Sequence, residues 1–479
     1  MATLATSVAL PNPSNRASAA WRPIIRAMGQ TGGASLGSGL LSLLATKIIA
    51  VVLGPSHVGL VSTLQQLRQT ALTGATLSGQ TALVQGVSST VGAPRRAYLR
   101  TVTALMVGAS TAVVATMLLA PHATLAFAGL NQQNPAYVSL IRWLAIAVAL
   151  SAIYVYLAAL LNSLGAIGTL AFVQLAGPAA MAILAYPVAR FVSGGSSTWF
   201  AVLLGGSAAV SVAAAWQALR RHRNLIHDWF SDDTDNNGSA QKRGYTTAAK
   251  QFFAISGAMF TGGLITHFAL VTVRARILRG QGLDVGGQFD AAWAISMNQA
   301  SLVLASLQTY YLPTLAAAKD RGARQTHISH TLTIASFAAT ALICTLIIAK
   351  PWVVRLLYSE QFRLTPGYLR WTLIGDYLKI TSWLLSIPLI ATANMRAFFS
   401  ADLFAYVAFV VSAVLLNRWW PAADSASIAF VILYAAHLTF CATCLWRKRE
   451  FRPDRRTIGT WAGGLTAILA VSAVCWRRV

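Results

Sequence analysis

The sequence predicts an all-α polytopic membrane protein with two six-helix bundles around a central cationic cavity. Apolar residues fill 56% of the 479 positions and charged residues only 10%, whereas a soluble domain carries about 25% charged residues. Apolar stretches of about 20 residues, long enough to cross a bilayer as a helix, recur along the whole chain. One long polar insert near the middle separates two groups of these stretches.

Twelve of the stretches are expected to span the membrane. They cover residues 31–53, 58–88, 101–127, 138–162, 166–190, 198–219, 248–274, 288–313, 330–350, 368–394, 402–417 and 427–446. A further apolar stretch, 457–475, is a possible thirteenth span and could instead lie at the membrane interface.

These spans divide the chain into five segments. We expect a mostly disordered cytoplasmic tail at 1–30, a first six-helix bundle at 31–222, a cytoplasmic linker at 223–247, a second six-helix bundle at 248–447, and a basic segment with an additional hydrophobic helix at 448–479. Six spans on each side of the linker indicate an internal duplication. Aligning Gly59 with Gly286 also places Lys47 opposite Arg274, as a parallel repeat would.

The net charge of +24 is high for a chain with so few ionisable residues. Lys and Arg are enriched in the cytoplasmic loops of membrane proteins. With the N-terminus in the cytoplasm, the cytoplasmic loops hold most of the Lys and Arg. Topology therefore accounts for most of the basic excess, and no nucleic-acid partner is expected.

The sequence contains no motif that predicts a cofactor or a metal. The four cysteines lie in apolar stretches, and Cys441 and Cys444 form a lone C-x-x-C that we interpret as two small apolar residues on adjacent helical turns. No G-x-x-x-x-G-K-[ST] occurs, so this chain is not expected to hydrolyse ATP.

A polar stripe follows the predicted span 58–88. Its members recur at spacings of three and four, which places them on one helix face: Ser62, Gln65, Gln69, Thr73, Thr76 and Gln80. The span 288–313 repeats this pattern weakly, with Asn298. Such a stripe either bonds helices together or lines a hydrophilic route. Six positions along one helix favour the route, because one or two are enough to bond helices together.

Several charges remain inside predicted spans. A charge at the centre of a spanning helix costs about 2.5–3.5 kcal/mol, so it should face water, a partner or a substrate. Arg68 lies roughly 15 Å into its helix, near the midplane. Lys47 either reaches the headgroups with its long side chain or faces a cavity, and Arg274 lies in a basic turn or at a cavity rim. Asp290 begins a span, where it favours the helix N-terminus.

Asp376 and Lys379 lie three residues apart in "GDYLKITSW" and can pair on one helix face. The pair either locks two helices together or forms a proton- or ion-coupled switch. Apart from Asp376, the charges expected at depth are cationic. A cationic cavity suits phosphate or pyrophosphate, with Arg as a bidentate partner, and does not suit cationic drugs.

Four segments of the chain resemble one family of transporters. They are "KIIAVVLGPSHVGLVSTLQQL" (47–67), "VRARILRGQGLDVGGQFDAAWAIS" (273–296), "TYYLPTLA" (309–316) and "LRWTLIGDYLKITSWLLSIPLIATANMRAFF" (369–399). They resemble the O-antigen and enterobacterial-common-antigen polysaccharide flippases of the multidrug/oligosaccharidyl-lipid/polysaccharide (MOP) exporter superfamily. The G-D-x-x-K-x-x-S-W-L-L run at Gly375–Leu385 is the most specific part. The long N-terminal tail and the stretch 457–475 depart from the usual twelve-helix pattern.

The resemblance implies two six-helix bundles around a V-shaped cavity. It also implies transport of undecaprenyl-pyrophosphate-linked oligosaccharides from the inner to the outer leaflet of a bacterial inner membrane, without covalent chemistry. Membrane lipids are expected partners, and a polysaccharide polymerase and a chain-length regulator are candidate partners.

The predicted site follows from the charges and the stripe. We expect alternating access, in which Lys47, Arg68 and Arg274 hold the pyrophosphate. The expected contacts to sugar hydroxyls are Gln65, Gln69, Thr73, Gln80 and Asn298, and the expected coupling residues are Asp376 and Lys379.

Three other functions stay open. The first is a multidrug antiporter of the same superfamily, which the cationic charges disfavour. The second is a membrane-embedded glycosyltransferase or polymerase that uses the same lipid carrier, which would need carboxylates or histidines in larger outer loops than these. The third is a non-transporting scaffold for polysaccharide assembly, which the polar stripe disfavours.

Overall fold

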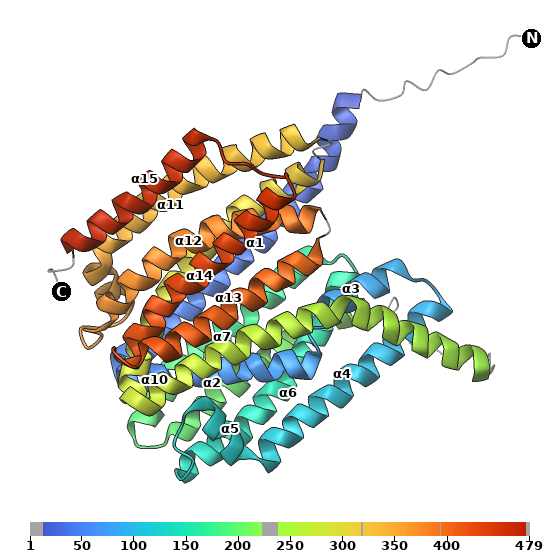
Figure 1. Ribbon diagram of the computed structural model, residues 1–479. Coiled ribbons are helices and arrows are strands. Elements are labelled where there is room, and N and C mark those ends of the chain that lie inside the picture. Colours follow the sequence, from blue (N-terminus) through green and yellow to red (C-terminus); the bar gives the residue numbers. More distant parts are fainter. Residues whose placement is uncertain (1–12, 223–237, 318–319, 393, 476–479) are drawn as a thin grey trace, which may run out of the picture.

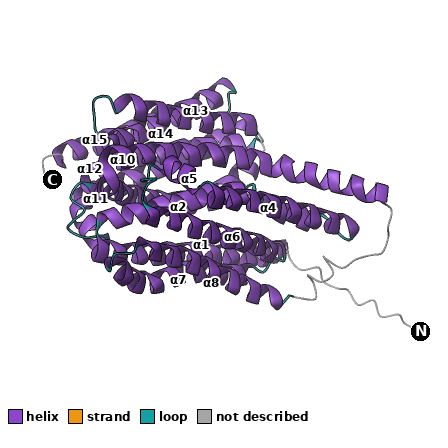
Figure 2. Cartoon of the chain, turned by 90° about the horizontal axis from the view of Figure 1, so that it is seen from below, coloured by secondary structure: helices purple, strands orange, loops and turns teal. Residues whose placement is uncertain are grey.

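The computed structural model describes residues 13–222, 238–317, 320–392 and 394–475. Within these ranges every regular element is a helix (Figure 2). Figure 1 shows long helices that lie side by side, with their axes roughly parallel to one another. The predicted all-α fold class is confirmed.

The helices of the first half precede residue 222. They are α1 (Pro13–Leu53), α2 (Pro55–Thr76), α3 (Gln80–Ser89), α4 (Ala93–Leu119), α5 (Pro121–Ala128), α6 (Pro135–Ser163), α7 (Ile167–Ser193), the short 3-10 helix η1 (Ser197–Trp199) and α8 (Phe200–Arg220). Proline occupies the first turn of α2, α4, α5 and α6. A helix tolerates proline there because the first backbone N–H groups have no intrahelical acceptor.

The helices of the second half follow residue 237. They are α10 (Gly238–Ala317), α11 (Arg321–Leu357), α12 (Thr365–Ala391), α13 (Met395–Leu416), α14 (Ala422–Arg447) and α15 (Arg455–Val474). α10 bends at Gly282, whose φ of 82° lies in the left-handed region that glycine adopts without steric cost. We call its parts before and after Gly282 the first leg and the second leg.

Eleven helices among the described residues are long and apolar enough to cross a membrane, and α15 is one of them. The predicted spans 248–274 and 288–313 are the two legs of α10, which count as one helix in this number. The predicted span 58–88 is interrupted, because Leu77 and Ser78 have positive φ angles and end α2 before α3 begins. Helices occupy all thirteen predicted stretches within the described residues. The stretches 58–88 and 101–127 are each broken into two helices, 248–274 and 288–313 are joined in α10, and 58–88 is not among the eleven candidate spans.

Three predicted boundaries differ from the structure. The span predicted at 101–127 is α4, which ends at Leu119, and Pro121 then begins the separate helix α5. The tail predicted to be mostly disordered at 1–30 is helical from Pro13 onward. The predicted linker is likewise helical from Gly238, whereas residues 1–12 and 223–237 lie outside the described ranges.

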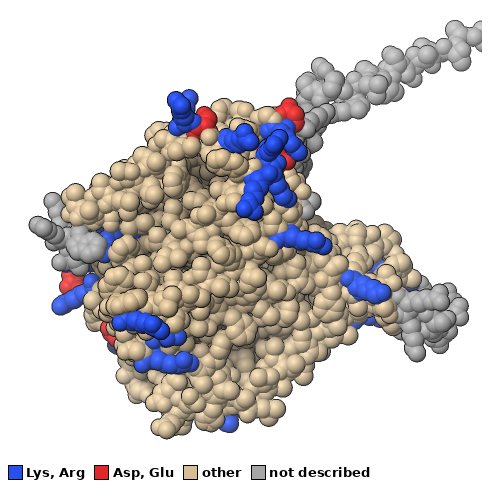
Figure 3. Space-filling view, in the orientation of Figure 1, with Lys and Arg blue, Asp and Glu red and all other residues tan. Residues whose placement is uncertain are grey.

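Successive long helices run in opposite directions between the two ends of the bundle. We call these ends the inner end and the outer end, after the predicted orientation. The inner end holds the end of α3 and the start of α4, and the outer end holds Gly282 and the end of α7. On the face in Figure 3, Lys and Arg gather towards the two ends, and uncharged residues cover the band between them. An uncharged band between charged ends is the pattern of a helical bundle in a bilayer.

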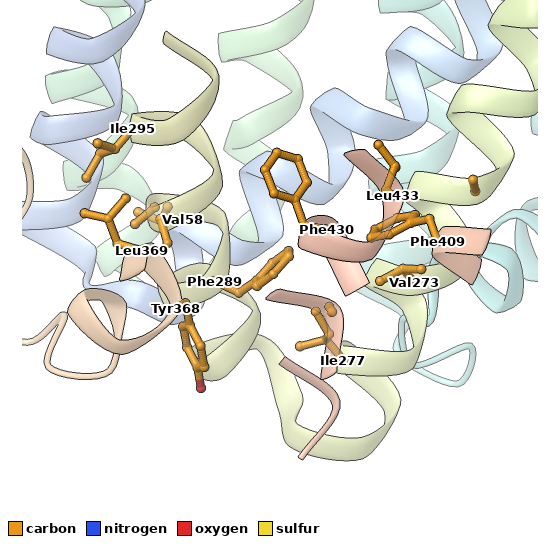
Figure 4. Close-up of a cluster of buried hydrophobic side chains, with 14 of the residues drawn as sticks. Val58, Val273, Ile277, Phe289, Ile295, Tyr368, Leu369, Phe409, Phe430 and Leu433 are labelled. Atoms are coloured by element: carbon orange, nitrogen blue, oxygen red, sulfur yellow. The ribbon is translucent and has the colours of Figure 1, made fainter. Parts of the chain in front are cut away.

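α10 makes most of the contacts between the two halves, among the helices that the structure describes. It packs along α2 and touches α3, α4 and α5, and it also contacts α12, α13 and α14. Near its bend, Phe289 lies in a cluster of buried apolar side chains with Phe430 and Tyr368 (Figure 4). The second leg is therefore anchored in the apolar core of the second half.

Candidate functional site

A polar cavity of about 860 Å³ lies beside α2 and α10. Its wall comes from α1, α2, α6, α7 and α8 of the first half, and from α10. The polar residues of this wall are Ser35, Ser38, Ser42, Thr46, Ser62, Gln65, Gln66, Arg68, Gln69, Ser151, Tyr154, Gln174, Ser207, Ser211, Arg274 and Asp290. Along α1 the wall extends from Thr46 to Ser35, towards the inner end.

The α2 part of the wall is the polar stripe that the sequence predicted. Ser62, Gln65 and Gln69 all line the cavity, because their spacing keeps them on one face of α2. Gln66 joins them, and its Nε2 lies 3.2 Å from Nδ1 of His267 on α10. The stripe is therefore a cavity lining along the middle of α2.

Arg68 lines this cavity and has no acidic partner among the residues that the structure describes. The side chain is half-buried, and its Nε is buried without a hydrogen-bond partner. None of the ion pairs among the described residues includes Arg68. Since moving an ion out of water costs several kcal/mol, this guanidinium is suited to hold an anion that enters the cavity.

Arg274 also lines the cavity, but it has a partner. Its Nη2 forms an ion pair with Oδ1 of Asp290, and its Nη1 lies 3.4 Å from the carbonyl oxygen of Ser62 on α2. Asp290 is 4% exposed and lies well inside the second leg of α10. The interpretation of Asp290 as a helix-terminal acid was wrong, and Asp376 is not the one acid at depth.

Four predicted contact residues lie outside the cavity wall. Lys47 is half-buried on α1, beside the wall residue Thr46. Thr73 donates a hydrogen bond to the carbonyl oxygen of Gln69. Gln80 is exposed and begins α3, because the break after α2 interrupts the predicted stripe.

Asn298 is the fourth, and it is exposed on the second leg of α10. Its side chain donates a hydrogen bond to the carbonyl oxygen of Ala294, 2.8 Å away. Ala294 itself lines the cavity, so Asn298 lies one helical turn beyond the wall.

Asp376 and Lys379 lie in the core of the second half and do not form the predicted ion pair. Oδ2 of Asp376 accepts a hydrogen bond from Gln299 on α10 at 2.7 Å. The ammonium of Lys379 lies 3.0 Å from Sδ of Met297 and 5.7 Å from the ring centre of Tyr434. The two charges point to different neighbours, so they are not a simple helix-locking pair.

The sequence carried a signal for a further part of the wall that the prediction missed. Ser35, Ser38, Ser42 and Thr46 recur at spacings of three and four on α1, like the stripe on α2. Ser38 donates a hydrogen bond to the carbonyl oxygen of Gln174 on α7, 3.2 Å away. Two facing polar stripes therefore line the cavity.

The cavity wall offers groups that bind anions and hydroxyls. All four cysteines are free thiols. The described residues include no group of three or more His, Cys, Asp or Glu that could hold a metal ion. The cavity instead offers two guanidinium groups, amides and hydroxyls, which can bind an anion and hydrogen-bond polar groups attached to it.

Comparison with known proteins places the fold. A chain described as lipid II flippase MurJ in an inward closed conformation superposes with a TM-score of 0.69 at 14% identity, over 94% of this chain and 99% of that chain. An inward-facing multidrug resistance MATE family transporter of the MOP superfamily gives 0.68 at 15% identity, over 91% and 96%. The chain has the fold of these transporters.

Sequence comparison gives a shorter match. The lipid III flippases of Escherichia coli (strain K12) and Shigella flexneri are each 25% identical over 183 residues, which are 38% of this chain. The match spans 44% of the length of these relatives. No family model matches the chain.

Proposed function

We propose that this chain flips undecaprenyl-pyrophosphate-linked oligosaccharide repeat units from the cytoplasmic to the periplasmic leaflet of a bacterial inner membrane by alternating access. One observation carries the proposal. Within an apolar helical bundle lies a polar cavity with Arg68, which has no ion-pair partner among the described residues. Such a cavity lets a charged, hydroxyl-rich headgroup cross without meeting hydrocarbon.

The chemistry of the cavity fits this cargo. Arg68 and Arg274 offer planar donors that match phosphate oxygens in pairs. Gln65 and Gln69 offer amides to sugar hydroxyls. The lipid tail would stay in the bilayer throughout, so the chain needs no covalent step and we propose that it is not an enzyme.

The comparisons support this class of cargo in general terms. The curated relatives are described as lipid III flippases, and one fold neighbour as a lipid II flippase. The O-antigen type of substrate and the cytoplasmic N-terminus remain parts of the proposal, as do a polysaccharide polymerase and a chain-length regulator as partners. The roles of Lys47, Thr73, Gln80 and Asn298 also remain predictions.

The fold neighbours also include multidrug transporters. A cavity for cationic drugs would need carboxylates that outnumber the cations. Here Asp290 is already paired with Arg274, and Arg68 has no ion-pair partner in the described part of the chain, so the wall is cationic. We therefore favour the anionic headgroup over a cationic drug as cargo.

The test is translocation of a lipid-linked oligosaccharide by the purified chain in liposomes. We expect Arg68→Ala to slow translocation by about tenfold or more, because a hydrogen bond to a charged group contributes about 1.5–3 kcal/mol. Arg68→Lys should restore part of the rate, because it keeps the charge and loses the paired geometry.

Arg142→Ala is the matched control. Arg142 is exposed on α6 and lies outside the cavity wall, so its loss should leave the rate unchanged. Equal rates for Arg68→Ala and Arg142→Ala would remove Arg68 from the mechanism. Transport of a cationic dye in place of the lipid-linked oligosaccharide would favour the antiporter.

A further inference from the structure

We infer that Asp290 is a positioning residue that occupies Arg274 until an anionic headgroup takes its place, and that this exchange releases the closed outer end of the cavity. The inference rests on the proposed function, because it takes the headgroup to be phosphorylated. We call the contacts of Arg274 with Asp290 and Ser62 the latch.

The latch ties three helical segments together. Gly282 lies midway in the sequence between Arg274 and Asp290, so their ion pair joins the two legs of α10 across its bend. The same guanidinium reaches the carbonyl oxygen of Ser62 on α2. One side chain therefore fixes the angle of α10 and holds α10 against the first half.

Next to the latch, towards the outer end, α2 and α10 pack backbone against backbone. A Cβ atom on Gly59 would overlap the carbonyl oxygen of Leu283, and one on Gly287 would overlap the carbonyl oxygen of Pro55. No side chain or ligand fits between the helices at this crossing. The crossing therefore closes the gap between α2 and α10 on the outer side of the latch, and we take it to be the outer closure that the latch maintains.

The start of the second leg is attached to the second half. The side-chain amide oxygen of Gln288 accepts a hydrogen bond from the backbone N–H of Leu364 at 2.7 Å. The backbone carbonyl oxygen of Gln288 accepts one from the Thr365 hydroxyl at 2.9 Å. Gln281, at the end of the first leg, accepts a hydrogen bond from the backbone N–H of Ala423 at 2.7 Å. Movement of the second leg away from α2 would therefore carry the start of α12 with it.

The latch and an incoming anion compete for one guanidinium. Arg68 and Arg274 line the same cavity, and the inference takes a pyrophosphate held by Arg68 to contact Arg274 as well. A phosphate that bonds to Arg274 displaces Asp290. Coupling of this kind is reciprocal: if the anion opens the latch, an open latch must bind the anion more tightly.

The first measurement is outer-end accessibility. In a background without the four native cysteines, Gln65→Cys reports on the cavity wall, and a membrane-impermeant thiol reagent is applied to right-side-out vesicles. We expect Asp290→Asn to be labelled faster than the parent without any ligand. The control is Asp284→Asn, which removes an exposed acid of α10 that bonds to Gln288 and does not touch Arg274.

The second measurement is anion affinity, which a purely structural acid would not tighten. We expect Asp290→Asn to bind inorganic pyrophosphate more tightly than Asp284→Asn, by a factor within the usual coupling range of about 5- to 150-fold. Asp290→Glu keeps the competing charge and should bind pyrophosphate like the parent. Weaker or unchanged pyrophosphate binding by Asp290→Asn would overturn the inference.

A third measurement needs no change at position 290 and holds even if Asp290→Asn fails to fold. Vesicles of the Gln65→Cys parent are loaded with sodium pyrophosphate or with sodium chloride at matched ionic strength. Pyrophosphate should speed labelling from outside, and equal labelling rates would overturn the latch.

Translocation of lipid-linked oligosaccharide is measured in parallel, on chains that keep Gln65, to separate the two proposals. Pyrophosphate-dependent labelling without translocation would support the latch and refute the proposed cargo. Translocation by Asp290→Asn at the parental rate, with parental labelling, would refute the latch and support the cargo.

Discussion

Asp376 shows how the surroundings of a single side chain define what it can do. It is fully buried, and its carboxylate is bonded to the amide of Gln299 instead of to Lys379. A buried carboxylate without a bonded cation is costly, and binding a proton or a cation relieves that cost. We therefore propose that Asp376, with Lys379 nearby, couples transport to an ion gradient.

This proposal predicts a change in how translocation depends on the gradient. The parent should move lipid-linked oligosaccharide faster when a proton or sodium gradient is imposed on the liposomes. Asp376→Asn should translocate at one rate with or without the gradient, because the amide cannot take up the ion. Asp424→Asn, which changes a half-buried acid in the first turn of α14, should keep the dependence. Gradient dependence retained by Asp376→Asn would exclude Asp376 as the coupling group.

At the scale of elements, α15 makes specific packing contacts with helices of the second half, in addition to being apolar. It lies alongside α11 (Figure 1) and also contacts α12. The hydroxyl of Tyr377 donates a hydrogen bond to the carbonyl oxygen of Trp461 at 2.8 Å. At the start of α15, Asp454 accepts hydrogen bonds from Thr457, which lower the pKa of its carboxyl. The additional helix therefore belongs to the packed second half.

Two neighbouring glycines of α15 provide a matched test. A Cβ atom on Gly464 would overlap Thr340 and Tyr377, whereas one on Gly463 meets nothing within 4 Å. Gly464→Leu should therefore destabilise the folded chain by about 1–3 kcal/mol, the usual cost of overpacking, and Gly463→Leu should have little effect. Thermal unfolding in detergent measures both, and equal midpoints would show that α15 is not packed on α11 as described.

Some features of the helices could be predicted from the sequence, and others could not. Helical period alone placed Gln65 and Gln69 on the face of α2 that lines the cavity. It could not place the break after α2, because Leu77 and Ser78 adopt positive φ angles without being glycine. The Arg274–Asp290 pair also escaped prediction, since it forms only once α10 bends at Gly282 and brings its two legs together.

At the scale of the whole molecule, the orientation that we propose from the distribution of basic loops has a direct test. Ser89 ends α3 at the inner end, and Ser193 ends α7 at the outer end; both are exposed. In intact cells that carry a cysteine-free background, Ser193→Cys should react with an impermeant thiol reagent. Ser89→Cys should react only after permeabilisation. The reverse pattern would invert the chain in the membrane and contradict the direction of transport that we propose.

The two halves of the molecule contribute unequally to the cavity wall, and this has a consequence for the size of the cargo. Five helices of the first half form most of the wall, while among the described residues of the second half α10 alone contributes to it. On the proposed function, the headgroup binds to the wall formed by the first half, and movement of α10 opens the cavity. The largest glycan that can pass is then limited by how far α10 bends at Gly282, and not by the volume of the cavity.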